Sequence, residues 1–177
     1  MPGKMCPACV RNVSGMARLV HNAPMLHIAL YQPEIPPNTG NIMRLAANTG
    51  SQLHLIAPLG FALDEKRLRR AGLDYRDQAT VTLHEDWQAF CVWRGARRLW
   101  AFSTKADTCY SQASYEPEDI LLFGPESRGL PEALFMGRPD VAPVRLPMVP
   151  GSRSLNLANA VSVAVFEAWR QCGFDGA

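Results

Sequence analysis

The feature that most constrains the fold is an alternation of short apolar runs and helical patterns, which begins at Leu26. The apolar runs lie at 26–31, 52–57, 79–83, 98–102, 119–123 and 142–146. The helical patterns lie at 38–49, 64–71, 86–94 and 155–171. The strongest runs, LHIALY and DILLF, show no polar alternation, which is typical of strands buried on both faces of a parallel sheet. The sequence therefore predicts an α/β protein with an open, mostly parallel sheet and helices on both faces.

The chain of 177 residues suits one domain with a short appendage. Hydrophobic residues make up 47% and charged residues 19%, which excludes widespread disorder. No apolar stretch approaches the ~18 residues of a membrane span, so we expect no membrane contact. The first 25 residues do not follow the alternation and lack the apolar core of a signal peptide. We expect residues 1–25 to form a flexible extension and residues 26–177 to form a single domain.

The cysteines favour a cytoplasmic protein without a disulfide framework, because their number is odd. They are Cys6, Cys9, Cys91, Cys109 and Cys172. Cys6 and Cys9 form a C-x-x-C pair, which is found in zinc sites and redox sites. A zinc site needs about four ligands, and only His21 and distant cysteines could complete one. A redox pair should follow a strand, and none is expected here. We interpret the pair as an inert motif and expect no metal.

One unusual loop, FGPESRGLP, follows the apolar run at 119–123, at an edge of the sheet where ligands bind in such folds. Gly124 lets the backbone approach a ligand closely, Glu126 places a carboxylate beside that contact, and Gly129 permits a left-handed exit. The same residues also suit a plain tight turn. The loop is neither a G-x-G-x-x-G nor a Walker sequence, which argues against a nucleotide-binding oxidoreductase.

Two further loops carry polar side chains at helix starts. In LPMVPGSRSLNLANA (146–160), Ser154 and Asn156 can cap the last helix or bind a ligand. In PNTGNIMR (37–44), we expect Asn38 or Thr39 to cap the helix, with Gly50 just beyond its end. Arg44 falls opposite the apolar face of that helix, so it is either solvated or directed at a substrate.

Two helical segments suggest macromolecular partners. The segment at 64–71 contains four cations, which form either solvated surface or a phosphate-contacting patch for RNA: Lys66, Arg67, Arg69 and Arg70. The last helix is apolar nearly all round. We therefore expect it to be buried on most sides by the core, by a partner subunit, or by both.

Taken together, these loops resemble the three motifs of the SPOUT RNA methyltransferases. The residues that carry the resemblance lie at 30–50, 60–61, 64–75, 122–131 and 146–171. The chain is most similar to the small members that methylate the 2′-oxygen of cytidine or uridine 34 in tRNA. The resemblance covers nearly all of the chain from Leu26 to Phe174, and its motifs are specific in combination.

The resemblance implies a deep trefoil knot near the C-terminus, a site for S-adenosylmethionine in that knot, and a homodimer through the C-terminal helix. By position, the implied cofactor-binding residues are Phe102, Gly124, Glu126, Leu146, Met148, Ser154 and Asn156. Arg44 matches an arginine associated with catalysis. The implied RNA-binding residues are Arg44, Lys66, Arg67, Arg69, Arg70 and Arg153. The implied substrate is the wobble nucleotide 34 of tRNA, C or modified U, in leucine isoacceptors.

Two other functions within the same fold remain open. The chain could methylate the ribose of another RNA, either rRNA or a different tRNA position, although it has no room for the extra RNA-binding domain that the rRNA enzymes commonly carry. It could also bind RNA without catalysis, but Arg44, Gly124, Ser154 and Asn156 argue against this. A guanidinium has a pKa above ~12, so we expect Arg44 to orient the substrate rather than to remove a proton, with Glu126 a candidate proton acceptor.

Overall fold

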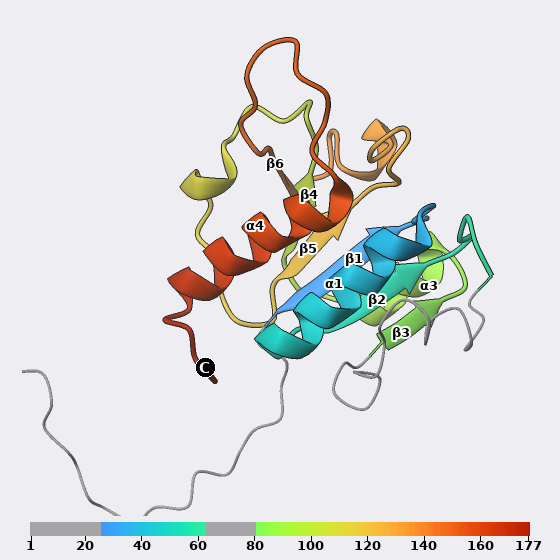
Figure 1. The fold of residues 1–177 in the computed structure, drawn as a ribbon, viewed down its shortest axis with the longest axis horizontal. Helices are drawn as coiled ribbons and strands as arrows, with labels where there is room; N and C mark the ends of the chain where they lie inside the picture. The colour runs from blue at the N-terminus through green and yellow to red at the C-terminus, as the bar shows by residue number, and fades with distance from the viewer. Residues whose placement is uncertain (1–25, 63–80) are drawn as a thin grey trace, which may run out of the picture.

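A parallel six-stranded sheet forms the centre of the computed structural model, which describes residues 26–62 and 81–177 (Figure 1). The strands are β1 His27–Tyr31, β2 Gln52–Ile56, β3 Val81–His84, β4 Leu99–Phe102, β5 Ile120–Phe123 and β6 Val141–Val144. Their order is β3-β2-β1-β5-β4-β6, and every neighbouring pair is parallel. The predicted parallel sheet is confirmed.

Helices cover both faces of the sheet, as expected. They are α1 Pro36–Thr49, α3 Trp87–Arg94 and α4 Leu157–Gln171, with short 3₁₀ turns η1 Tyr110–Gln112 and η2 Glu132–Leu134. Helices α1 and α4 pack side by side on one face, whereas α3 lies on the other (Figure 1). Alternate residues of β1 enter different cores: Ile28 and Leu30 pack with α1 and α4, and Ala29 packs with Phe90 of α3. The sheet therefore has two separate hydrophobic layers.

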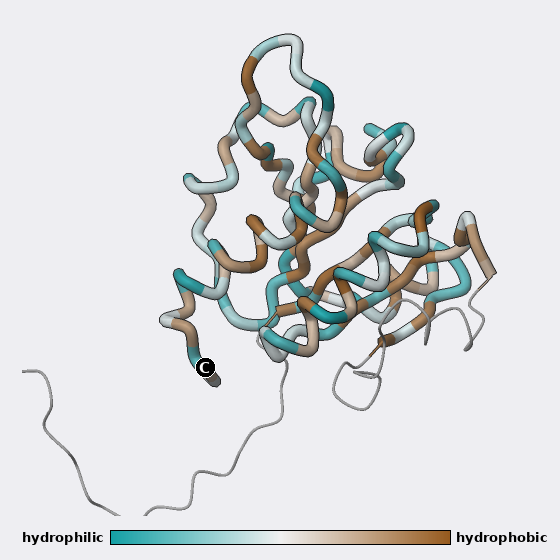
Figure 2. Tube along the Cα trace, in the orientation of Figure 1, coloured by the Kyte–Doolittle hydropathy of each residue, from teal (hydrophilic) through white to brown (hydrophobic). Residues whose placement is uncertain are grey.

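Hydrophobic residues concentrate along the central strands, whereas much of the connecting chain is polar (Figure 2). This distribution matches the continuously apolar runs of the sequence. In the described ranges, no helix has the length and apolar character needed to cross a membrane.

The start of α1 differs from the prediction. Ile35 occupies the cap position and no side chain bonds there, while Asn38 and Thr39 lie buried within the first turn. Pro36 and Pro37 explain the difference, because a proline ring presets the helical φ and carries no N–H that needs a cap. The C-terminal prediction is confirmed, since Gly50 has φ 64° and donates its N–H to the carbonyl of Ala46.

Helix α4 is covered on one face by the described residues. One face packs on the core, with Val161, Ala164 and Val165 fully buried. On the other face Val163 and Phe166 are 43% and 48% exposed. The apolar residues therefore form two different surfaces, only one of which is covered by residues in the described ranges. The predicted extension at 1–25 and the predicted basic helix at 64–71 lie outside the described residues.

Candidate functional site

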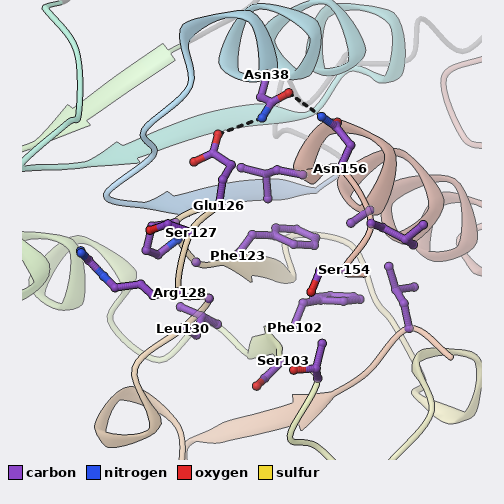
Figure 3. A pocket seen from close by; sticks show the side chains of 18 of the residues that line it. Asn38, Phe102, Ser103, Phe123, Glu126, Ser127, Arg128, Leu130, Ser154 and Asn156 are labelled. Atoms are coloured by element: carbon purple, nitrogen blue, oxygen red, sulfur yellow. Dashed lines mark hydrogen bonds between the residues drawn. The ribbon is translucent and has the colours of Figure 1, made fainter. Parts of the chain in front are cut away.

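A cavity of about 480 Å³ lies beyond the carboxyl ends of β4 and β5, between their loops and the segment that leads into α4 (Figure 3). Its wall contains all seven of the residues proposed for cofactor binding: Phe102, Gly124, Glu126, Leu146, Met148, Ser154 and Asn156. They come from four separate stretches of the chain. The fold thus brings together residues up to 54 positions apart (102 to 156) at the edge of the sheet where ligands bind in parallel α/β proteins.

Two stacked aromatic rings form the apolar part of the cavity. Phe102 ends β4 and Phe123 ends β5, and their ring centroids lie 4.6 Å apart with 18° between the planes. Leu130, Leu146 and Met148 complete this part of the wall. A flat apolar surface bounded by backbone groups suits a neutral aromatic ring such as a nucleobase.

Gly124 is required by its own loop. A Cβ at this position would lie 2.2 Å from the backbone nitrogen of Leu130 and 2.3 Å from the carbonyl carbon of Gly129. The loop folds back this closely because Gly129 adopts φ 68° and donates its N–H to the carbonyl of Pro125 at 2.9 Å. The space that the missing side chain leaves is therefore filled by the returning backbone of the same loop.

Glu126 is the centre of a polar network that joins three segments. Its carboxylate accepts hydrogen bonds from the backbone N–H groups of Glu34 at 2.8 Å and Ile35 at 3.2 Å, and from Nδ2 of Asn38 at 3.0 Å. Asn38 in turn accepts a 2.8 Å bond from Asn156, whose Oδ1 caps α4 at the N–H of Ala158 (Figure 3). Both oxygens of Glu126 are thus occupied in fixing loops, which counts against Glu126 as the proton acceptor.

Asn156 caps α4, which is one of the two roles expected for it. Asn38, one of the two residues expected to cap α1, instead bridges Glu126 and Asn156 from inside the first turn of α1. A signal was present in the sequence, since two prolines directly before Asn38 leave few backbone donors to cap.

Two of the expected RNA-binding residues, Arg44 and Arg153, lie in the described ranges, and neither lines the cavity. Arg44 is exposed on α1, six residues or about 9 Å along the axis from Asn38, with its neighbours Ile42 and Ala46 buried. Arg153 is exposed beside Ser154. The remaining four, Lys66, Arg67, Arg69 and Arg70, lie outside the described residues.

The described residues offer no cluster of three or more His, Cys, Asp or Glu side chains that could hold a metal ion. Cys91, Cys109 and Cys172 are free thiols at half-buried positions. The C-x-x-C pair lies in the segment that the structure does not describe.

Comparison with known proteins identifies the family. The profile of the SpoU rRNA Methylase family matches residues 25–166. The chain belongs to this family. Among curated relatives of this SpoU methylase, the tRNA (cytidine(34)-2′-O)-methyltransferase of Escherichia coli strain K12 is 58% identical over 153 residues, which cover 86% of this chain and 98% of the relative.

Solved structures show the same fold. A structure solved to study the 2-OH methylation of C/U34 on tRNA is 49% identical and superimposes with a TM-score of 0.78, over 85% of this chain and 97% of that one. An AdoMet-bound rRNA methyltransferase from Sinorhizobium meliloti is 27% identical with a TM-score of 0.73, over 82% and 56% of the two chains. The SpoU methylase described here thus shares its sheet and helices with methyltransferases that act on RNA.

Proposed function

We propose that this protein transfers a methyl group from S-adenosylmethionine to the ribose 2′-oxygen of nucleotide 34 of tRNA, C or modified U, in leucine isoacceptors. The observation that carries the proposal is the 58% identity to the E. coli tRNA (cytidine(34)-2′-O)-methyltransferase over 98% of its length. The cavity supports it, because the seven residues assigned to the cofactor by motif line one wall.

The cavity fits the methyl donor. An adenine ring would lie against Phe102 and Phe123, and backbone groups of Phe102, Gly124, Leu146 and Met148 would hold the adenine and ribose. Ser154 and Asn156 supply polar groups to the lining of the cavity. When bound, S-adenosylmethionine supplies a methyl group activated by a positively charged sulfur.

Arg44 and Glu126 have different roles in this proposal. A guanidinium stays protonated at any physiological pH, so Arg44 donates hydrogen bonds that orient the 2′-hydroxyl or an adjacent phosphate and stabilise developing negative charge. Its exposure on α1 leaves it accessible to RNA. Glu126 holds the loops around the cavity through its contacts to Glu34, Ile35 and Asn38.

The proposal includes a trefoil knot, a homodimer and a cytoplasmic location.

Support for the knot comes from two hydrogen bonds that join the segment after β4 to the end of β6. The N–H of Arg145 donates to the carbonyl of Thr108, and the N–H of Tyr110 donates to the carbonyl of Arg145, both at 2.9 Å. After β6 the chain makes a long loop that projects beyond the sheet before it enters α4 (Figure 1). Stretching the unfolded chain between residues 26 and 171 tests the knot, since a tightened knot shortens the measured contour length. The full contour length would rule it out.

The reaction is tested with purified protein, labelled S-adenosylmethionine and a leucine tRNA transcript. We expect one 2′-O-methyl group at nucleotide 34, identified by mass spectrometry of the digested tRNA. The matched control is the same tRNA with a 2′-deoxyribose at nucleotide 34 only, which must take up no methyl group. Incorporation into that control, or into rRNA in place of tRNA, would show a different substrate. Binding of tRNA and donor without transfer would show a non-catalytic protein.

A further inference from the structure

Glu34 lies between β1 and α1, outside the cavity wall, yet its carboxylate binds a residue of that wall. One oxygen accepts the backbone N–H of Ser127 at 3.0 Å, and the other accepts the hydroxyl of Ser127 at 2.9 Å. The guanidinium of Arg128 lies 3.9 Å from the same carboxylate, whose side chain is 30% exposed. The hydrogen bonds from Ser127 hold the pKa of Glu34 below its usual value.

The contact is reciprocal. While Glu34 accepts the N–H of Ser127, the neighbouring Glu126 accepts the N–H of Glu34 at 2.8 Å. Each of the two segments therefore contributes one carboxylate that accepts a backbone N–H of the other segment. We call Glu34, Glu126 and Ser127 the clasp. Hydrogen bonds to ionised acceptors are stronger than neutral ones, so this arrangement fixes the distance between the two segments.

A third segment, at Gly60, packs against the backbone of the clasp residue Glu34. Gly60 donates its N–H to the carbonyl of Pro33 at 2.9 Å. A Cβ at Gly60 would lie 2.8 Å from Cα of Glu34, closer than van der Waals contact allows. The backbone of Glu34 thus packs tightly against Gly60, and any side chain at residue 60 would push it.

The residues that the clasp holds line the cavity. Glu126, Ser127 and Arg128 belong to the wall, and Arg128 also donates a 2.7 Å hydrogen bond to the side chain of Gln32. We propose that Glu34 is a positioning residue of the methyl-donor site: its carboxylate holds the Glu126–Arg128 rim in place and thereby sets the affinity for the donor. The inference rests on the proposed function, which supplies the identity of the ligand.

The test measures binding of S-adenosylhomocysteine to the full-length protein by calorimetry. Glu34→Ala should weaken binding about tenfold, because the rim loses two hydrogen bonds to a charged acceptor. Glu34→Gln keeps one acceptor oxygen and should restore most of the affinity. Gly60→Ala should weaken binding in the same direction by displacing Glu34. The matched control is Glu116→Ala, which removes an exposed carboxylate paired with Arg98 at 2.8 Å, away from the cavity, and should change nothing.

Further measurements separate positioning from general damage. In Glu34→Ala, KM for S-adenosylmethionine should rise while the single-turnover rate at saturating donor and the tRNA affinity stay within threefold. Ser127→Ala should weaken donor binding in the wild-type background and have no further effect in the Glu34→Ala background. This second variant decides the matter if Glu34→Ala does not fold.

Two negative outcomes differ in meaning. If the wild type binds S-adenosylhomocysteine and Glu34→Ala binds it within twofold as well, Glu34 is not a positioning residue, while the proposed function stands. If the wild type does not bind it, the proposed function falls and the inference falls with it.

Discussion

At the scale of single residues, the cavity wall depends on side chains that fix the backbone. A side chain at residue 124 would collide with the backbone of Gly129 and Leu130. The carboxylate of Glu126 accepts hydrogen bonds from two backbone N–H groups and from Asn38. Such residues affect a ligand indirectly, through the shape of the loop. Substitutions there should change loop structure and affinity together, whereas substitutions at exposed substrate-facing residues should not.

Gly124→Val should abolish donor binding and destabilise the protein. The added Cβ would lie 2.2 Å from the nitrogen of Leu130, so the loop must open. Overpacking of this kind costs about 1–3 kcal/mol. Thermal unfolding and calorimetry with S-adenosylhomocysteine measure the two effects. A variant with wild-type melting temperature and affinity would show that the loop folds equally well without this close approach.

Arg44 and Ser154 should separate substrate effects from donor effects. Arg44→Ala should leave the affinity for S-adenosylmethionine within about threefold, because Arg44 lies outside the cavity wall. The rate of methyl transfer should fall at least ~100-fold, which is the usual effect of losing one oriented hydrogen-bond donor. Ser154→Ala, a change in the wall, should mainly weaken donor binding. Arg44→Lys should not rescue, since it keeps the charge but loses the planar fork. Donor titration and single-turnover methylation measure both. Near-normal methylation by Arg44→Ala would make it an ordinary surface residue.

At the scale of elements, the sequence predicts the strands better than the surroundings of the helices. The apolar runs locate all six described strands within a few residues. The signal is clearest for β1 and β5, which are buried on both faces, and weakest for the edge strand β3, where Val81 and Leu83 are exposed. The apolar residues of α4 carry no comparable information, since Val161 and Val163 look alike although one is buried and the other exposed. Grouping the seven wall residues required the family resemblance, because Phe102 and Asn156 meet only through tertiary structure.

Strands β1, β2 and β3 together contain a chain of buried histidines. Nδ1 of His27 lies 3.1 Å from Nε2 of His54, and Nδ1 of His54 lies 3.0 Å from Nε2 of His84. The ring centroids of Trp93, in α3, and His54 lie 3.9 Å apart. The guanidinium carbon of Arg97 lies over the ring of Trp93, 4.9 Å from its centroid. Burial lowers the pKa of His27 to about 4 and that of His54 to about 3, with Arg97 adding to both shifts, and burial also lowers the pKa of His84.

This chain should make the fold sensitive to acid. Histidines in the unfolded chain have a pKa of about 6.5, so below that pH the unfolded state binds protons that the folded state does not bind. The free energy of unfolding should keep its full value above pH 6.5 and should decrease as the pH drops toward 4. At pH 5 the loss from His54 alone should be on the order of 2 kcal/mol. Urea unfolding at pH 7 and pH 5 measures this loss. His54→Phe should flatten the dependence. If that variant loses the same free energy of unfolding between pH 7 and pH 5, the acid sensitivity arises from groups other than His54.

The basic segment should act on RNA binding alone. Arg67→Ala combined with Arg70→Ala should weaken tRNA binding and reduce its salt dependence, by up to about one unit of slope per lost phosphate contact. Donor affinity should not change. Titration of tRNA at two salt concentrations tests this, and an unaltered slope would mean that the two arginines contact no phosphate. These residues lie outside the described ranges, so the prediction rests on the sequence.

At the scale of the whole molecule, α4 runs from the cavity to an apolar surface that the described part of the chain leaves exposed. Its first residues continue the polar network from Asn156, its inner face packs on the sheet, and its outer face exposes Val163 and Phe166. Phe174, 42% exposed, contacts Trp169 at the end of the same helix. Exposed apolar side chains gathered on one helix are the pattern expected of a subunit interface. The proposed homodimer would therefore form next to the donor site.

Substitutions on the two faces of α4 should give different results. Val163→Glu with Phe166→Glu should dissociate the dimer and leave the monomer folded, because both positions are exposed within one chain. Val161→Glu should instead unfold the protein, since Val161 is fully buried in its own core and a charge there has no partner. Sedimentation velocity gives the oligomeric state and circular dichroism the folding. A wild-type monomer with full activity, or a double variant that remains dimeric, would exclude this face of α4 as the interface.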